Sequence, residues 1–142
     1  HLNEWTALQV FSRMLLSSDI VLHIGNSLPV RLANYLNIPK GIAVYHNRGT
    51  SGIDGTVSTA VGNALANPHK TVFLLIGDVS MLYDQNGLLL QTLPKNLKIL
   101  VLNNHGGGIF KLLDDAARQP DVDTFFTGSQ PRNFEALCVL HS

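Results

Sequence analysis

The sequence contains one cysteine, Cys138, and no excess of charge of either sign. A single cysteine excludes an internal disulfide and a metal site built from several thiolates. Ten acidic side chains balance ten lysines and arginines, so no basic surface is expected for nucleic acid or an anionic membrane. No apolar run approaches the roughly twenty residues of a membrane span, and the first residues do not resemble a signal peptide. These absences favour a cytoplasmic protein without nucleic-acid or membrane partners.

Several common functional motifs are missing as well. No G-x-G-x-x-G follows the first apolar run and no Walker lysine pattern occurs, which argues against binding of dinucleotides and nucleoside triphosphates. The six histidines show no metal-binding spacing, and no serine, histidine and acid order indicates a hydrolase. Any anion that the protein binds must therefore be met by local groups.

Short apolar runs alternate with segments of helical periodicity along most of the chain. This order predicts an α/β fold, with a doubly wound parallel sheet, right-handed crossovers and helices on both faces. The expected strands are 19–24, 42–46, 71–76 and 97–102, and the expected helices are 3–17, 28–36, 56–66, 81–93 and 133–140.

The length and the end of the sequence bear on its domain organisation. With 142 residues, 45% of them hydrophobic, the sequence predicts one domain over 1–142 that can bury a core. After Phe110 the alternation weakens, and residues 114–130 are polar and predicted to form a loop. Because a doubly wound domain usually adds further strands, we expect a truncated domain that is a fragment of a longer chain.

Polar residues follow two of the predicted strands at their carboxyl ends. Asp78 comes just after the run 71–76, and Asn104 comes just after the run 97–102. Such ends meet at one edge of a parallel sheet, where open α/β proteins bind ligands. A carboxylate, an amide oxygen and a carbonyl of the following glycine-rich loop are ligands that Mg²⁺ prefers. For Asp78 alone, the common alternative is a carboxylate that caps a helix N-terminus.

The pairs Gly77-Asp78 and Asn103-Asn104 resemble the signature of thiamine-diphosphate enzymes, although that family usually has Gly-Asp-Gly and this chain has Val79. The longer segments 47–55, 77–86 and 103–110 resemble more narrowly the carboxy-terminal cofactor domain of the 2-succinyl-5-enolpyruvyl-6-hydroxy-3-cyclohexene-1-carboxylate synthases of menaquinone biosynthesis. The resemblance extends from about residue 26 to residue 110.

The resemblance implies a site for thiamine diphosphate and a Mg²⁺ or Mn²⁺ ion. It implies metal ligation by the side chains of Asp78 and Asn104 and by the carbonyl of Gly106. By the same resemblance, Ile53 would enforce a bent cofactor and the Ser51 carbonyl would accept a hydrogen bond from its amine. The residues implied to surround the cofactor are Ser51, Ile53, Gly77, Ser80, Gly107, Gly108, Ile109 and Phe110.

The resemblance also implies a reaction and its substrates. The reaction decarboxylates 2-oxoglutarate and adds the succinyl unit to isochorismate, and Ser27, Arg31 and Arg48 are implied to bind these acids. Guanidinium groups suit this role because they bind carboxylates bidentately. In the family a glutamate from the pyrimidine domain of a neighbouring subunit activates the cofactor. We therefore expect no catalytic residue in this fragment, no activity of the fragment alone, and a homodimer or homotetramer formed through the missing domain.

Other interpretations stay open at this point. One is a different thiamine-diphosphate enzyme, of the acetolactate synthase or 2-oxo acid decarboxylase type, which would share the metal motif but not the paired arginines. Another is a non-catalytic binding module of doubly wound fold. For Arg31 and Arg48 the ordinary alternative is a solvated surface charge, and for Ile53 it is loop packing.

Overall fold

A computed structural model describes residues 3–141, so the outermost positions of the domain predicted over 1–142 lie outside the described residues. Its centre is a four-stranded sheet in the order β2-β1-β3-β4, in which every strand pair is parallel. The strands are β1 (Ile20–Ile24), β2 (Ala43–His46), β3 (Thr71–Gly77) and β4 (Leu97–Leu102). The predicted α/β class with a parallel sheet is confirmed.

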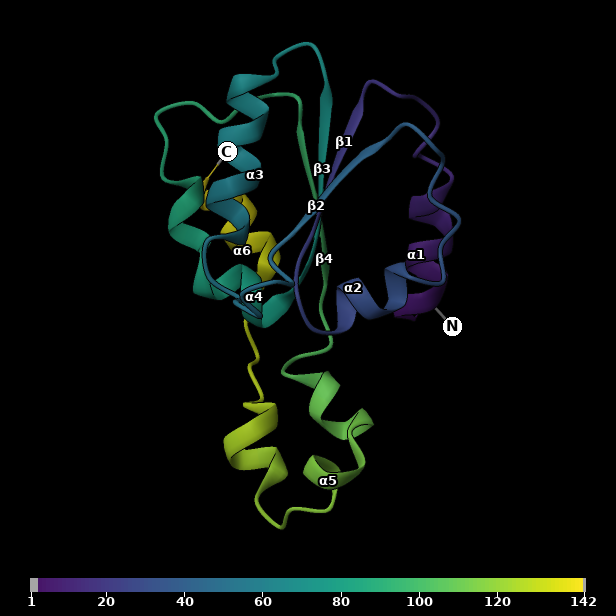
Figure 1. Ribbon diagram of the computed structural model, residues 1–142. Coiled ribbons are helices and arrows are strands. Elements are labelled where there is room, and N and C mark those ends of the chain that lie inside the picture. The colour runs from purple at the N-terminus through teal and green to yellow at the C-terminus, as the bar shows by residue number, and fades with distance from the viewer. Residues whose placement is uncertain (1–2, 142) are drawn as a thin grey trace.

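Helices cover both faces of this sheet (Figure 1). On one face lie α1 (Glu4–Ser12) and α2 (Leu28–Ala33), and on the other lie α3 (Thr56–Ala66), α4 (Asp78–Tyr83) and α6 (Phe134–Leu140). The crossover from β1 to β2 through α2 therefore uses one face, and the crossovers to β3 and β4 through α3 and α4 use the other, as in a doubly wound sheet.

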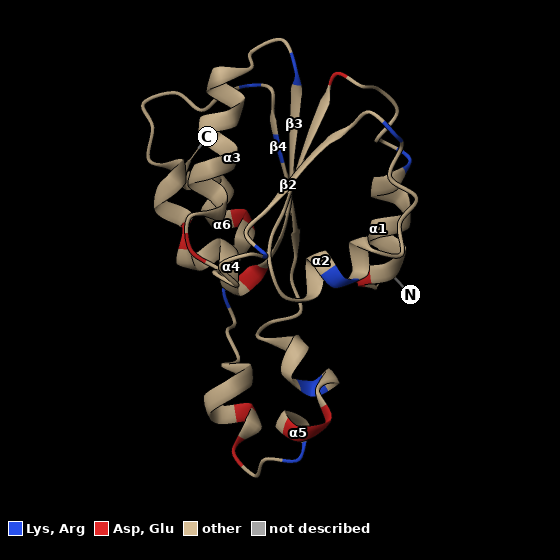
Figure 2. Ribbon diagram, in the orientation of Figure 1, with Lys and Arg blue, Asp and Glu red and all other residues tan. Residues whose placement is uncertain are grey.

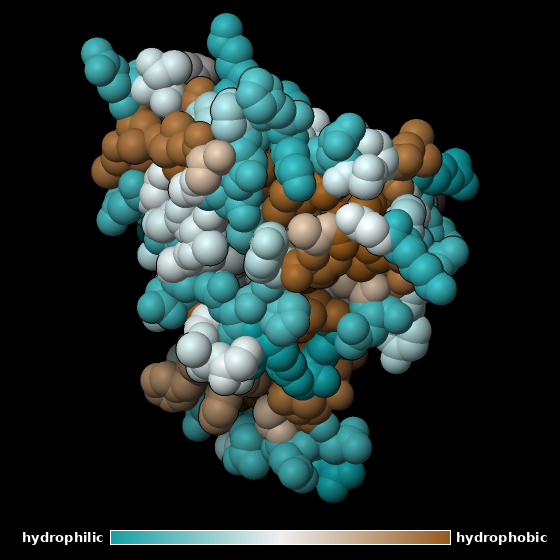
Figure 3. Space-filling view, turned by 45° about the horizontal axis from the view of Figure 1, so that its top comes forward, coloured by the Kyte–Doolittle hydropathy of each residue, from teal (hydrophilic) through white to brown (hydrophobic). Residues whose placement is uncertain are grey.

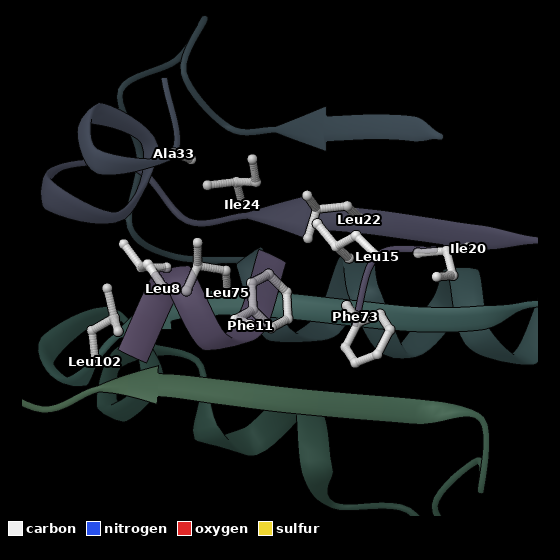
Figure 4. Close-up of a cluster of buried hydrophobic side chains, with 10 residues drawn as sticks. All are labelled: Leu8, Phe11, Leu15, Ile20, Leu22, Ile24, Ala33, Phe73, Leu75 and Leu102. Carbon is white, nitrogen blue, oxygen red and sulfur yellow. The ribbon is translucent and has the colours of Figure 1, made fainter. Parts of the chain in front are cut away.

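Side chains of β3 alternate between two hydrophobic cores, one on each face. Phe73 and Leu75 pack with α1, β1 and α2, whereas Leu74 and Ile76 pack with α3 and α4. The first core contains Leu8, Phe11, Leu15, Ile20, Leu22, Ile24, Ala33, Phe73, Leu75 and Leu102 (Figure 4). A shift of β3 by one residue would exchange its two sets of side chains, so burial on both faces fixes its register. The position of Asp78, the next residue after β3, is fixed with it.

Four segments differ from their predicted structure. α1 ends at Ser12 and not at residue 17, and α2 ends at Ala33 and not at residue 36. The helix predicted over 81–93 is wrong in its bounds, because α4 starts directly at the end of β3 and a 3-10 helix, η1 (Gln85–Leu88), follows it. The loop predicted over 114–130 is also wrong, because this segment contains the short helix α5 (Asp114–Ala117) and the π-helical turn η3 (Val122–Thr127).

A long-range contact explains the early end of α4. Asp84, the residue after α4, accepts hydrogen bonds from the backbone N–H of Ser58 (2.7 Å) and from its hydroxyl (2.8 Å). Ser58 lies in the first turn of α3, and the N-cap of that helix is Gly55, which has no side chain to accept such a bond. Asp84 therefore supplies the cap from another element and turns the chain toward α3.

A small lobe beyond the carboxyl end of β4 consists of η2 (Gly108–Leu112), α5 and η3 (Figure 1). It carries both acidic and basic residues (Figure 2). The hydrogen bond and charge of Lys111, 2.8 Å from the Asp123 carboxylate, lower the pKa of Asp123, but both side chains are exposed and the pair adds little stability. Two backbone hydrogen bonds join the end of the lobe to the loop after β4. The Gly107 N–H donates to the Thr127 carbonyl, and the Gln130 N–H donates to the His105 carbonyl.

The opposite edge of the sheet is formed by β2, of which Val44 and Tyr45 are exposed. Figure 3 shows apolar side chains gathered among polar ones on the viewed face.

His23, in the neighbouring strand β1, is buried and stacks on Tyr45, with ring centroids 5.3 Å apart. This burial lowers the pKa of His23. Within residues 3–141 no helix combines the length and apolar character that a membrane crossing needs.

Candidate functional site

The strand order changes direction between β1 and β3. From β1 the chain moves outward to β2, and it then crosses back to β3 on the other side of β1. The connections that leave β1 and β3 therefore lead to opposite faces, to α2 and to α4 (Figure 1). In open parallel sheets this arrangement separates the two connections and leaves a crevice where ligands bind.

A cavity of about 150 Å³ lies at this crevice. Its walls come from the loop after β1, the junction of β3 and α4, the glycine-rich loop after β4 and the first turn of α1. The predicted site residues that line it are Ser27, Ile53, Gly77, Asp78, Ser80, Asn104, Gly106, Gly107, Gly108, Ile109 and Phe110. Three other predicted residues, Ser51, Arg31 and Arg48, do not line it.

Asp78 is the first residue of α4 and is only 2% exposed. The positive end of the helix favours a carboxylate there. Its Oδ2 accepts a 2.6 Å hydrogen bond from Nε2 of Gln130, and the same nitrogen donates to Oδ1 of Asn103 at 3.2 Å. No sequence pattern indicated Gln130, which lies 52 positions from Asp78 in a segment predicted to be a loop.

Asn104 follows β4, and its amide group is held by α1. The Nδ2 of Asn104 donates a 2.9 Å hydrogen bond to Oε1 of Glu4. Glu4 is in the first turn of α1 and also lines the cavity. This contact joins residues 100 positions apart, so no local pattern could have indicated it.

The glycine-rich loop 106–108 has no room for side chains. A Cβ on Gly106 would lie 2.8 Å from the backbone oxygen of Thr127, and its φ of +154° is a conformation that other residues rarely adopt. A Cβ on Gly108 would lie 2.6 Å from Nδ2 of Asn104. Glycine at these positions keeps the backbone of the loop close to the cavity, as in loops that bind phosphate groups.

The predicted residues outside the cavity lining differ in their surroundings. Arg48 donates from Nη1 to Oδ1 of Asn26 at 3.3 Å, and Asn26 lines the cavity, so Arg48 lies beside the site. Arg31 is exposed on α2, next to the loop after β1. Ser51 is exposed in the loop after β2 and has a φ of +54°.

The charged residues in the cavity lining, Glu4 and Asp78, are both acidic. No lysine or arginine lines the cavity, and within residues 3–141 no three His, Cys, Asp or Glu side chains are grouped to hold a metal. An anion alone would be repelled by the two carboxylates. A divalent cation on one carboxylate and neutral oxygens would reverse the local charge, so the lining favours a metal and an anion together.

Comparison with known proteins agrees with this geometry. Residues 13–140 match the family described as thiamine pyrophosphate enzyme, C-terminal TPP binding domain. Proteins named 2-succinyl-5-enolpyruvyl-6-hydroxy-3-cyclohexene-1-carboxylate synthase are 42% identical over 94% of this chain in Flavobacterium johnsoniae, 43% over 98% in Cytophaga hutchinsonii and 48% over 83% in Cronobacter sakazakii. The matched parts are 24%, 25% and 22% of those proteins, so the chain spans about a quarter of the length of these curated relatives.

Proposed function

Since the chain belongs to the family of C-terminal thiamine pyrophosphate-binding domains, we propose that its cavity binds the diphosphate of thiamine diphosphate through a divalent metal ion. One observation carries the proposal: Asp78, Asn104 and the loop 106–108 line one cavity at the point where the strand order reverses. Open parallel sheets bind ligands at this point.

The residues present fit a Mg²⁺ or Mn²⁺ ion. The carboxylate of Asp78, the amide oxygen of Asn104 and the carbonyl of Gly106 are oxygen ligands, the type that both ions prefer. Mg²⁺ is bound by six ligands at about 2.1 Å and usually keeps some of its water. Three protein oxygens therefore leave positions for phosphate oxygens and water.

The cavity also fits one end of the cofactor. Its volume of about 150 Å³ is below the roughly 300–1,000 Å³ of sites that enclose a whole small molecule. We propose that the metal and the diphosphate bind in this cavity. Other parts of the intact enzyme would then form the walls around the rest of the cofactor. Apolar side chains of Ile53, Ile109 and Phe110 at the cavity would contact the organic part. When bound, the cofactor would supply the electron sink that decarboxylation requires.

For the intact protein we propose the activity in its relatives' names, with 2-oxoglutarate and isochorismate as substrates and a role in menaquinone biosynthesis. The identities of 42–48% to these synthases support it over another thiamine enzyme or a non-catalytic module. We propose Ser27 as a substrate contact in the cavity lining, Arg48 as a contact beside the cavity and Arg31 as a contact at its outer side. We also propose that the intact protein is a cytoplasmic homo-oligomer in which a partner subunit provides the activating glutamate.

Calorimetric titration of the intact protein with thiamine diphosphate tests the metal site. Binding should require Mg²⁺ and disappear in EDTA, and Asp78→Asn should weaken it more than about ten-fold because the metal loses its charged ligand. Asp19→Asn is a matched control, since Asp19 is exposed and lies at the amino end of β1. Binding without metal, or binding that Asp78→Asn leaves unchanged, would contradict the proposal.

A further inference from the structure

We propose that Glu4 is a positioning residue of the metal site, whose carboxylate holds the Asn104 side chain with its amide oxygen free for the metal. The proposal rests on the proposed function, because it concerns a ligand of the same metal. Glu4 belongs to α1, and it lies outside the sequence motifs that follow β3 and β4.

The two ends of the Asn104 amide are not equivalent toward a cation. The oxygen offers lone pairs to Mg²⁺, whereas the NH₂ group is a hydrogen-bond donor. Half a turn about the last side-chain bond exchanges the two ends, and this torsion has broad, roughly two-fold preferences. Asn104 is exposed, so packing alone does not select one orientation.

The Glu4 carboxylate selects the orientation. An ionised carboxylate only accepts hydrogen bonds, and its Oε1 lies 2.9 Å from Nδ2 of Asn104. Rotation of the amide would place its oxygen against this carboxylate and replace a charge-assisted hydrogen bond by repulsion. Such bonds are about twice as strong as neutral ones, which is sufficient to fix an otherwise free amide.

Gly108 borders the same end of the amide. The position of a Cβ on Gly108 is 2.6 Å from Nδ2 of Asn104 but 3.6 Å from its Oδ1, so the nitrogen lies toward Gly108 and the oxygen lies farther away. The backbone at Glu4 belongs to a capped helix start, because Asn3 accepts a 2.8 Å hydrogen bond from the Thr6 N–H. The carboxylate thus acts on the ligand from a fixed helix end.

The hydrogen bond also makes Asn104 a better ligand. A carboxylate that accepts from the NH₂ group shifts electron density toward the amide oxygen, as outer-shell partners of metal ligands do. Loss of such a partner typically weakens metal binding about 10–100-fold.

The test measures the Mg²⁺ dissociation constant of the intact protein at a fixed thiamine diphosphate concentration. Glu4→Ala should raise this constant about 10–100-fold, and Glu4→Asp should raise it to a similar extent, because aspartate keeps the charge but is one methylene group too short to reach Nδ2 of Asn104 in the same way. Glu135→Ala is the matched control: Glu135 is in the first turn of α6 and does not line the cavity. At saturating Mg²⁺ the Glu4→Ala protein should recover wild-type cofactor affinity, and in EDTA it should stay folded, with a Tm only a few degrees below that of wild type because one hydrogen bond is lost.

The outcomes separate the two proposals. A wild-type protein that does not bind thiamine diphosphate, or binds it without metal, would refute the proposed function. Metal-dependent binding in wild type with an unchanged Mg²⁺ constant in Glu4→Ala would overturn the positioning role alone. An unchanged Mg²⁺ constant in Glu4→Asp would also overturn it, because it would show an effect of charge and not of orientation.

Discussion

Replacement of Gly108 by alanine should displace a proposed metal ligand while the fold stays nearly intact. The new Cβ would lie 2.6 Å from Nδ2 of Asn104, closer than real Cβ contacts allow, and 3.2 Å from its Cγ, which is tighter than most. The Asn104 side chain must therefore move. It can do so at low cost, because it is exposed and the clash involves no backbone atom.

The structure gives different magnitudes for stability and for metal binding. Movement of Asn104 breaks its hydrogen bond to Glu4. This bond is exposed to solvent and therefore contributes no more than a typical hydrogen bond, about 0.5–1.5 kcal/mol. The reduced freedom of the unfolded chain after a glycine to alanine change offsets about 0.4–1 kcal/mol of this. We expect a net loss of at most about 1 kcal/mol in the free energy of unfolding without metal. Mg²⁺ demands near-ideal geometry, so its affinity should fall at least about ten-fold.

Two other glycine variants provide the comparison. Gly106→Ala should destabilise the fold by about 3 kcal/mol or more, because its Cβ meets the Thr127 backbone and its φ is +154°. Gly62→Ala should stabilise it by about 0.5–1 kcal/mol, since Gly62 is inside α3 with nothing near its Cβ position. Urea unfolding in EDTA gives the stabilities, and Mg²⁺ titration gives the affinities. An unchanged Mg²⁺ affinity in Gly108→Ala would refute the assignment of Asn104 as a ligand.

Three further predictions concern the surroundings of the site. Arg48→Ala should lower kcat/KM about ten- to a thousand-fold without loss of cofactor affinity, and Arg31→Ala should lower kcat/KM less. Steady-state kinetics with each substrate varied in turn measures both effects, and wild-type values in both variants would remove the substrate role of the two arginines. Gln130→Leu removes the side-chain amide that donates to the buried Asp78 carboxylate. It should lower the free energy of unfolding by about 1–3 kcal/mol in EDTA and by less with Mg²⁺ and cofactor bound. Chemical denaturation under both conditions measures this, and equal losses would contradict the prediction. Burial lowers the pKa of His23 below its ordinary 6.5, so the unfolded chain takes up the proton at higher pH than the folded chain. The free energy of unfolding should therefore fall as the pH drops below 6.5. Measured from about pH 5 to pH 8, the free energy of unfolding should depend less on pH in His23→Gln than in wild type.

The sequence predicted those elements whose ends are determined locally. The bounds of α3 and β4 agree with the prediction, because turn residues such as Asn67 and Pro68 directly follow α3 and a continuous apolar run forms β4. The end of α4 was not predictable, because it depends on the contact between Asp84 and Ser58, 26 positions apart.

The same distinction holds for the candidate site. Asp78 and Asn104 could be placed near one another from sequence, because both follow parallel strands and such ends share one sheet edge. Their partners Gln130 and Glu4 could not, since these contacts depend on where a distant lobe and α1 pack. The metal-binding roles of all these residues stay predictions.

These two partners link the site to the packing of segments that are distant in sequence. The Oδ2 of Asp78 is held from residue 130 and the Nδ2 of Asn104 from α1, so each proposed ligand has one atom engaged by another segment. Local opening of either segment would release a ligand, and opening of short, partly exposed segments costs less than global unfolding. A metal that binds only the closed form must then stabilise the docking of α1 and of residues 128–132 by mass action. Amide hydrogen exchange in these two segments should therefore slow when Mg²⁺ and cofactor bind, while exchange in the buried strand β3 should change little.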